Sequence, residues 1–274
     1  MFRCTNCGVV FVHPLPSEEF LRKLYSREGK YQRHKPSNAT KQAPTARFQR
    51  FLDFIGSQAG IKKILDVGCS SGEFLYFARQ RGYNVKGVEV NEATVEVARA
   101  DDLDVFHGTI FEAKFSDEAF DCVVLADVIE HARDPRALLA ECTRVLAPGG
   151  LMIIETPSVD CFWSRITLAC SQFFGLPWSS LDPPWHLFHG TPNAWSGLAQ
   201  EFGFRLSAHW YHPNPGLKHE LGTLHLLKAF RQKKTIRSFL TMLLGFACYT
   251  ILFVFDRMNI LKKKDFAMTL IFKK

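Results

Sequence analysis

The sequence predicts an α/β fold: a mostly parallel, seven-stranded sheet with helices on both faces. Three observations predict it. An apolar run over residues 64–67 stops at a glycine-rich turn that leads into a helix, and a second apolar run ends in the acid Glu89. Short β-branched runs then alternate with amphipathic segments, as in strands joined by crossover helices. A chain of 274 residues with 47% hydrophobic residues is long enough to bury such a sheet.

The first 60 residues are predicted to be appendages to the sheet, divided into a short segment 1–16 and a helical cap 17–60. Residues 18–25 have helical spacing behind Ser17, a favourable N-cap. A second helix over residues 46–57 is expected to cover the ligand cleft. Its apolar face carries Phe48, Phe51, Leu52 and Ile55, which we interpret as core.

The core domain is predicted over residues 61–211, and residues 212–274 add an apolar helix and a closing strand. An insert over residues 160–191, rich in aromatic side chains, interrupts the core. Strands are expected at 63–67, 84–89, 105–107, 120–125, 150–156, 205–211 and 266–273. Helices are expected at 72–81, 91–100, 135–145 and 192–201.

The glycine-rich turn 68–72 fits three chemistries to different degrees. A dinucleotide fingerprint needs glycine at its first, third and sixth positions, where Gly68, Ser70 and Glu73 stand, which argues against NAD. The turn also matches the G-x-S-x-G nucleophile elbow of a hydrolase, with Ser70 as nucleophile. That elbow normally follows several strands, whereas this turn follows the first. The third chemistry is a nucleoside pocket in which Glu89 accepts both ribose hydroxyls.

Four segments together resemble the class I S-adenosylmethionine-dependent methyltransferases. Residues 65–72 (LDVGCSSG) look like their first motif, with Ser70 where a glycine usually stands, and residues 87–91 (GVEVN) resemble the acidic end of their second strand. Residues 120–131 (FDCVVLADVIEH) resemble their fourth strand and the segment after it, and residues 146–152 (LAPGGLM) their turn into the fifth. The resemblance implies a Rossmann-like fold, S-adenosylmethionine as cofactor, and a last strand inserted antiparallel beside the sixth.

The resemblance also implies how the cofactor is held. The turn is expected to line the methionine and ribose side, mainly through its backbone, while Asp66 orients the turn or meets the amino group. Glu89 binds the ribose and Val90 packs on adenine. The family usually has an acid where Thr109 stands, so a backbone N–H is expected to meet adenine instead. The predicted cofactor-binding residues are Asp66, Gly68, Cys69, Ser70, Gly72, Glu89, Val90, Thr109, Ile110, Ala126 and Asp127.

The predicted catalytic residues are His131, His186 and Glu130. Methyl transfer is an in-line displacement at a sulfonium, so alignment supplies much of the rate, and a base is needed only if the acceptor loses a proton. His131 follows the fourth strand, at the edge where such sheets bind ligands, which favours it as the base. Alternatively, Glu130 and His131 only shape the methionine pocket. We predict no metal, although some relatives bind magnesium with a set similar to Asp127, Glu130, His131 and His186.

The N-terminal sequence Cys4-Thr5-Asn6-Cys7-Gly8 has the shape of one zinc knuckle. A structural zinc needs four ligands, and the chain contains no second Cys-x-x-Cys. The segment resembles half of a zinc ribbon found in some relatives, and we interpret it as an incomplete knuckle. His13 or a partner chain could complete the site. The alternative is a short hairpin packed on the domain.

The distribution of charge and hydrophobic residues limits the kinds of partner that the protein is expected to bind. The net charge of +7 is concentrated in residues 218–274, which argues against nucleic acid. Residues 239–255 form an apolar run at the short limit of a bilayer span, with basic residues on both sides. We expect peripheral membrane contact there, with a buried helix or a dimer contact as the alternative. Cysteines in predicted strands and helices, and the lack of a signal peptide, indicate a cytoplasmic setting.

These observations predict a methyltransferase that modifies a small or lipid-like acceptor. The aromatic insert over residues 160–191 would exclude water and bind a greasy or ring-shaped molecule. The resemblance extends to relatives that modify quinone precursors, lipids or glycan-linked sugars. The alternatives are a non-catalytic S-adenosylmethionine-binding protein and a hydrolase with Ser70 as its nucleophile.

Overall fold

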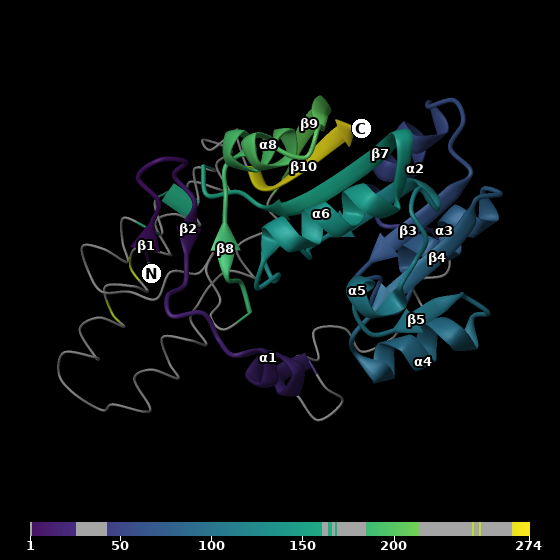
Figure 1. Cartoon of the computed structure of the whole chain (residues 1–274), viewed down its shortest axis with the longest axis horizontal. Helices are drawn as coiled ribbons and strands as arrows, with labels where there is room; N and C mark the ends of the chain where they lie inside the picture. The colour runs from purple at the N-terminus through teal and green to yellow at the C-terminus, as the bar shows by residue number, and fades with distance from the viewer. Residues whose placement is uncertain are drawn as a thin grey trace.

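The computed structural model describes residues 2–25, 43–160, 164–165, 168, 185–213, 243, 247 and 265–274. Its main sheet has the strand order β5-β4-β3-β6-β7-β10-β9 (Figure 1). The strands are β3 (Lys63–Val67), β4 (Asn84–Glu89), β5 (Val105–His107), β6 (Phe120–Ala126), β7 (Leu146–Pro157), β9 (Arg205–Pro213) and β10 (Asp265–Lys273). β10 pairs antiparallel with both β7 and β9, and the other pairs are parallel. The predicted fold class is confirmed.

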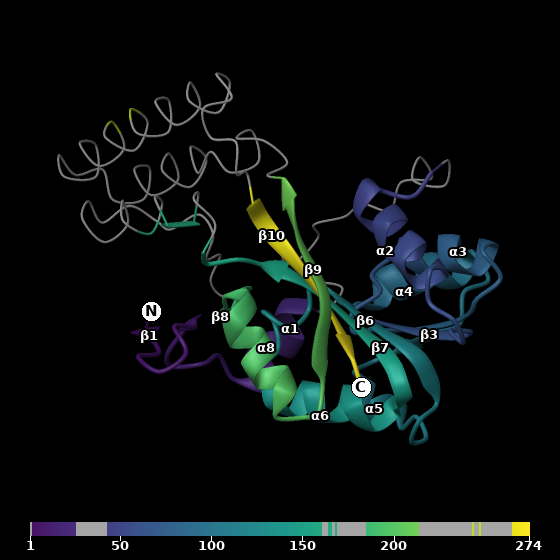
Figure 2. The ribbon, with the colours of Figure 1, turned by 90° about the horizontal axis from the view of Figure 1, so that it is seen from above.

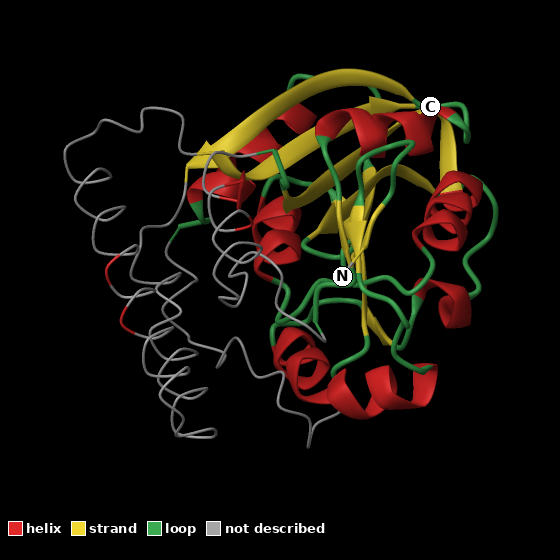
Figure 3. Ribbon diagram, turned by 90° about the vertical axis from the view of Figure 1, so that its left-hand side faces the viewer, coloured by secondary structure: helices red, strands yellow, loops and turns green. Residues whose placement is uncertain are grey.

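Helices cover both faces of this sheet (Figure 3). One face packs against α2 (Ala46–Gly56), α3 (Glu73–Gln80) and α4 (Glu92–Ala100), the other against α5 (Ile110–Ala113), α6 (Pro135–Val145) and α8 (Pro192–Gln200). The two cores alternate along β6, where Val123 lies in the core under α6 and Val124 in the core under α2. Successive strand side chains point to opposite faces, so one buried strand supplies both cores.

Several elements differ from the sequence prediction, β7 and α5 among them. β7 begins at Leu146 instead of residue 150, because Leu146 already pairs with Phe120 before a register shift in the ladder. α5 is not predicted, since its four residues are too few to show helical periodicity. A capping box formed by Thr109 and Glu112 starts it.

The N-terminal segment forms a hairpin that pairs with the end of the insert. β1 (Phe2–Arg3) and β2 (Val10–Phe11) are antiparallel, and β2 pairs with β8 (Phe188–His189) (Figures 1 and 2). The alternative interpretation, a short hairpin, therefore describes this segment. Among the described residues, Cys4 and Cys7 belong to no group of three or more potential metal ligands. The chain continues into α1 (Glu18–Tyr25), where Ser17 caps the N–H of Phe20.

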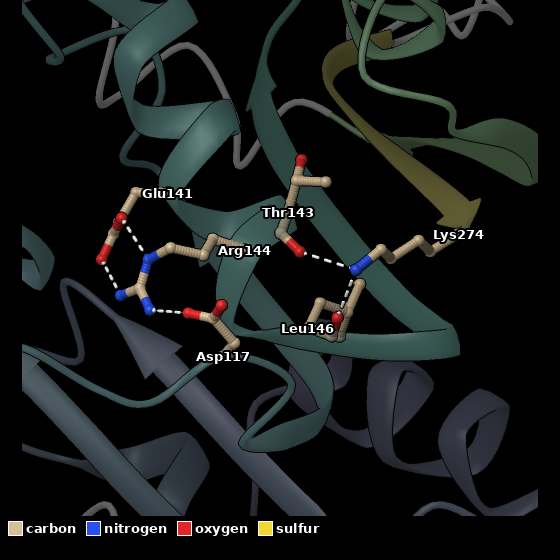
Figure 4. Close-up of polar contacts among 6 residues, drawn as sticks. All are labelled: Asp117, Glu141, Thr143, Arg144, Leu146 and Lys274. Atoms are coloured by element: carbon tan, nitrogen blue, oxygen red, sulfur yellow. Dashed lines mark hydrogen bonds and ion pairs between the residues drawn. The ribbon is translucent and has the colours of Figure 1, made fainter.

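The end of the chain is tied to the end of α6 (Figure 4). The Lys274 ammonium donates to the carbonyls of Thr143 and Leu146 at 2.9 and 2.6 Å. A cation at a helix C-terminus satisfies carbonyls that have no partner within the helix. Beside it, Arg144 pairs with Glu141 and Asp117. The two Lys274 bonds thus tie the end of β10 to the end of α6.

The apolar run 239–255 lies outside the described residues except for positions 243 and 247, and so does most of the insert before residue 185. The membrane and lid predictions therefore stay predictions. In the part of the chain that the structure describes, no helix has the length and apolar character needed to cross a bilayer.

Candidate functional site

The glycine-rich turn joins β3 to α3 and requires glycine at both ends. Gly68 and Gly72 have φ angles of +72° and +82°, a region that side chains with a Cβ rarely adopt. A Cβ on Gly68 would lie 2.6 Å from Val128 Cγ2, and one on Gly72 only 2.4 Å from Leu103 Cδ1. The backbone of the turn therefore fits closely between α4 and the segment after β6.

The acid at the end of β4 is bonded to this turn. Glu89 accepts hydrogen bonds from the N–H groups of Ser70 and Asn91, at 2.9 and 2.8 Å. Burial raises the pKa of Glu89, although both hydrogen bonds favour its charged form. The N–H groups of Gly68 and Cys69 donate to Val88 O. These bonds join the turn to β4. They also occupy N–H groups of the turn, so the turn offers a ligand a backbone that it can approach closely more than free hydrogen-bond donors.

The adenine side shows one exposed apolar residue and one occupied backbone donor. Val90 follows Glu89 and is 40% exposed. The N–H and hydroxyl of Thr109 both donate to the Glu112 carboxylate at 2.8 Å. Because the Thr109 N–H is occupied, the backbone N–H that we expect to meet adenine is that of Ile110.

A cluster that the sequence did not reveal lies at the carboxyl ends of β6 and β7. Arg47, on α2, donates to Asp127 at 2.6 Å and to the buried Glu155 at 2.8 Å. Burial opposes the charge on Arg47, but the two carboxylates outweigh it and raise its pKa. The sequence signal was weak: a single arginine beside the apolar face of a helix predicted to cover the cleft.

Asp66 lies next to this cluster, and its side chain is buried. Burial raises its pKa to about 8, against the lowering effect of Arg47, and the charge of Glu89 raises it further. At neutral pH its carboxyl is therefore mostly protonated. A cationic ligand beside it would favour the ionised form.

The predicted catalytic residues meet at the other side of the same sheet edge. Glu130, His131 and His186 offer potential ligand atoms that all lie within 4.8 Å of one another. Glu130 is fully buried and accepts from the Thr156 hydroxyl at 2.9 Å. Burial raises its pKa well above the usual range, which favours the protonated carboxyl. Asp127 is not in this set, because its carboxylate pairs with Arg47.

His131 is held by a backbone carbonyl. Its Nδ1 lies 2.8 Å from Trp185 O and 3.1 Å from the Tyr25 hydroxyl. A carbonyl can only accept, so Nδ1 carries the proton and Nε2 is the basic nitrogen of the neutral ring. Trp185 is fixed in turn, because the chain after it donates from Leu187 N and Phe188 N to Glu130 O.

The site residues thus form two groups along one edge of the sheet. The turn, Glu89 and Val90 form the first group, for which cofactor binding stays a prediction, and His131 and His186 belong to the second. Ala126 is half-buried at the end of β6, and Asp127 follows it with a φ of +56°. His189 is fully buried beside His186, and burial lowers its pKa well below the usual range.

The chain is similar to known methyltransferases. A family model described as a methyltransferase domain matches residues 19–209. The ubiquinone biosynthesis O-methyltransferase of Hahella chejuensis is 37% identical over 114 residues, which are 38% of this chain and 48% of that protein. The corresponding protein of Pseudomonas aeruginosa is 33% identical over 114 residues, 38% of this chain and 49% of its own length. The chain thus matches about half the length of these curated relatives.

Solved structures agree on the fold. A methyltransferase from Archaeoglobus fulgidus superposes with a TM-score of 0.55, at 18% identity, over 94% of this chain and all of that one. One from Mesorhizobium loti gives a TM-score of 0.54 at 12% identity, over 84% and 99% of the two chains. Both are S-adenosylmethionine-dependent methyltransferases, and at these identities they support the fold alone. The chain belongs to the methyltransferase domain family and has the class I, S-adenosylmethionine-dependent fold.

Proposed function

We propose that this protein transfers the methyl group of S-adenosylmethionine to a hydroxyl group on a ring-shaped acceptor of the quinone-precursor type. The observation that carries the proposal is His131: its Nδ1 is held by Trp185 O at 2.8 Å, at the sheet edge that also carries the cofactor turn. The curated relatives named for ubiquinone biosynthesis support the acceptor class. A phenolic hydroxyl must lose a proton, and the basic Nε2 of His131 is suited to receive it.

S-adenosylmethionine supplies the sulfonium methyl group. Glu89 holds the ribose, Val90 packs on adenine, and Arg47 orients Asp127 at the methionine end. The acceptor oxygen bonds to the methyl carbon as the sulfur–carbon bond breaks, and the hydroxyl proton moves to Nε2 of His131. S-adenosylhomocysteine and the methyl ether then leave. Most of the rate comes from holding the two reactants in line.

The other outcomes of the turnover test are a lipid acceptor, a glycan-linked sugar acceptor, and cofactor binding without catalysis. Peripheral membrane contact through residues 239–255 is a separate proposal. The Ser70 hydrolase alternative has lost its support, because the family assignment gives the turn another role and the Ser70 N–H is bonded to Glu89. A fluorophosphonate probe should leave the protein unlabelled.

Turnover with labelled cofactor should be measured against a farnesyl catechol, a phospholipid and a sugar nucleotide. We expect methylation of the catechol, and a loss of about 100-fold or more in kcat for His131→Gln, because general-base catalysis contributes that much. His209→Gln, an exposed histidine on β9, is the matched control. Cofactor binding without turnover on any acceptor would favour the non-catalytic alternative. If the kcat of His131→Gln equals that of wild type, His131 is not the general base.

Removal of metal ions tests the neighbouring cluster. We propose that no metal takes part, because Glu130 Oε2 accepts from the Thr156 hydroxyl and His131 Nδ1 donates to Trp185 O, so one potential ligand atom of each residue already has a protein partner. Dialysis against EDTA should change turnover less than about twofold. A loss of turnover that Mg²⁺ or Mn²⁺ restores would instead support a cation bound by Glu130, His131 and His186.

A further inference from the structure

Helix α1 lies apart from the seven-stranded sheet (Figure 1) and is held against the loop that carries His131. Arg133 donates from Nε to Pro16 O at 3.1 Å and pairs with Glu18 at 3.6 Å. α1 has no buried residue, and the side chains of Arg133 and Glu18 are exposed. Exposed ion pairs of this kind contribute only about 0–1 kcal/mol to stability. The contacts at the C-terminal end of α1 therefore matter for its position.

Those contacts are made by Tyr25, the last residue of α1. Its hydroxyl lies 3.1 Å from His131 Nδ1, and its ring stands at 90° to the imidazole with 6.2 Å between centroids. The same ring meets Trp185 at a centroid distance of 6.1 Å and an angle of 68°. Tyr25 thus touches the side chain of His131 and the residue whose carbonyl holds it.

The geometry at Nδ1 gives the tyrosine hydroxyl a defined role. The Nδ1 proton points to Trp185 O, so the Tyr25 oxygen is a second acceptor on the same side of the ring. Two oxygen atoms on this side fix the ring plane and oppose a flip that would exchange the nitrogens. They also stabilise the imidazolium that forms when Nε2 takes a proton.

We propose that Tyr25 is a positioning residue for methyl transfer: its hydroxyl orients His131, and its ring forms, with Trp185, an aromatic wall for a planar acceptor. This inference rests on the proposed function of His131. It extends the site to a residue 106 positions before His131 in the chain, and it makes α1 part of the acceptor side. Aromatic rings pair by offset stacking or edge-to-face contact, and a planar acceptor ring can join such an arrangement.

Two substitutions separate the hydroxyl from the ring. With the farnesyl catechol as acceptor, Tyr25→Phe should lower kcat about tenfold and leave KM for the acceptor within twofold. Tyr25→Leu should lower kcat as much and raise that KM at least about fivefold. In both, the Kd for S-adenosylmethionine and the Tm should match wild type. Glu19→Gln, an exposed position on the same helix, is the control. Unchanged kcat in Tyr25→Phe, or a parallel loss of cofactor affinity and Tm, would overturn the proposal.

A measurement without turnover keeps the inference independent of the acceptor. In histidine-labelled protein, the ¹⁵N signals of the His131 ring, assigned with His131→Gln, should report an Nδ1–H tautomer in wild type. Tyr25→Phe should shift or broaden them, and signals identical to wild type would contradict the proposal. If no acceptor is methylated but these signals move, the proposed function fails while the positioning contact stands.

Discussion

Gly72→Val is expected to abolish binding of S-adenosylmethionine, with a loss in affinity of at least about 100-fold. Valine at a φ of +82° is strained by about 1–3 kcal/mol, and its Cβ would meet Leu103 Cδ1 at 2.4 Å and Ala98 Cβ at 3.3 Å. Both neighbours are buried, so the start of α3 must move instead. That movement separates the Ser70 N–H from Glu89, and the turn and the ribose-binding acid lose their common geometry. Calorimetry on the purified variant measures the loss.

The matched control is Gly82→Val, at the opposite end of α3. Gly82 has a φ of +87°, so valine there suffers the same backbone strain, but a Cβ would have nothing within 4 Å. This variant should lose stability and keep its cofactor affinity. If Gly72→Val binds as tightly as wild type, the turn does not hold the cofactor. If both variants lose affinity alike, the cause is strain in α3 and not contact at the turn.

A cofactor side could be proposed from the sequence because its candidate residues are close together in the chain. A turn, the helix after it and the acid at the end of the next strand lie within residues 64–91, and each leaves a local pattern of glycine, apolar and acidic residues. The alternation of strands and helices likewise predicted the sheet, and the structure confirms it. Local sequence patterns were enough to propose the cofactor side and to predict the sheet.

The acceptor side depends on contacts between distant residues, which leave no such pattern. Tyr25 and His131 are 106 positions apart, and Arg47 reaches Glu155 across 108. The two-residue strands β2 and β8 are too short for periodicity to reveal, yet their pairing places the chain after Trp185 against Glu130. Sequence reasoning identified His131 and His186 as candidates, but not the groups that hold them.

Arg47→Met is expected to destabilise the fold by about 3 kcal/mol and to weaken cofactor binding. Glu155 is 2% exposed, and its removal from water is offset by the guanidinium 2.8 Å away. Loss of one partner leaves a buried charge uncompensated, which costs about 3–5 kcal/mol. The lower value applies here because the Arg47 side chain keeps 33% of its surface in solvent. Urea denaturation measures the stability, and calorimetry measures the affinity for S-adenosylmethionine.

The double variant Arg47→Met/Glu155→Gln distinguishes the two effects. A neutral amide at position 155 removes the unpaired charge, so we expect the double variant to regain about 2 kcal/mol of the lost stability. Affinity should stay low, because Asp127 still lacks the arginine that orients it at 2.6 Å. Recovery of both would mean that Arg47 acts on the cofactor only by keeping the protein folded. Recovery of stability alone assigns Arg47 to the methionine end of the site, a role that follows from a contact between α2 and the ends of two strands.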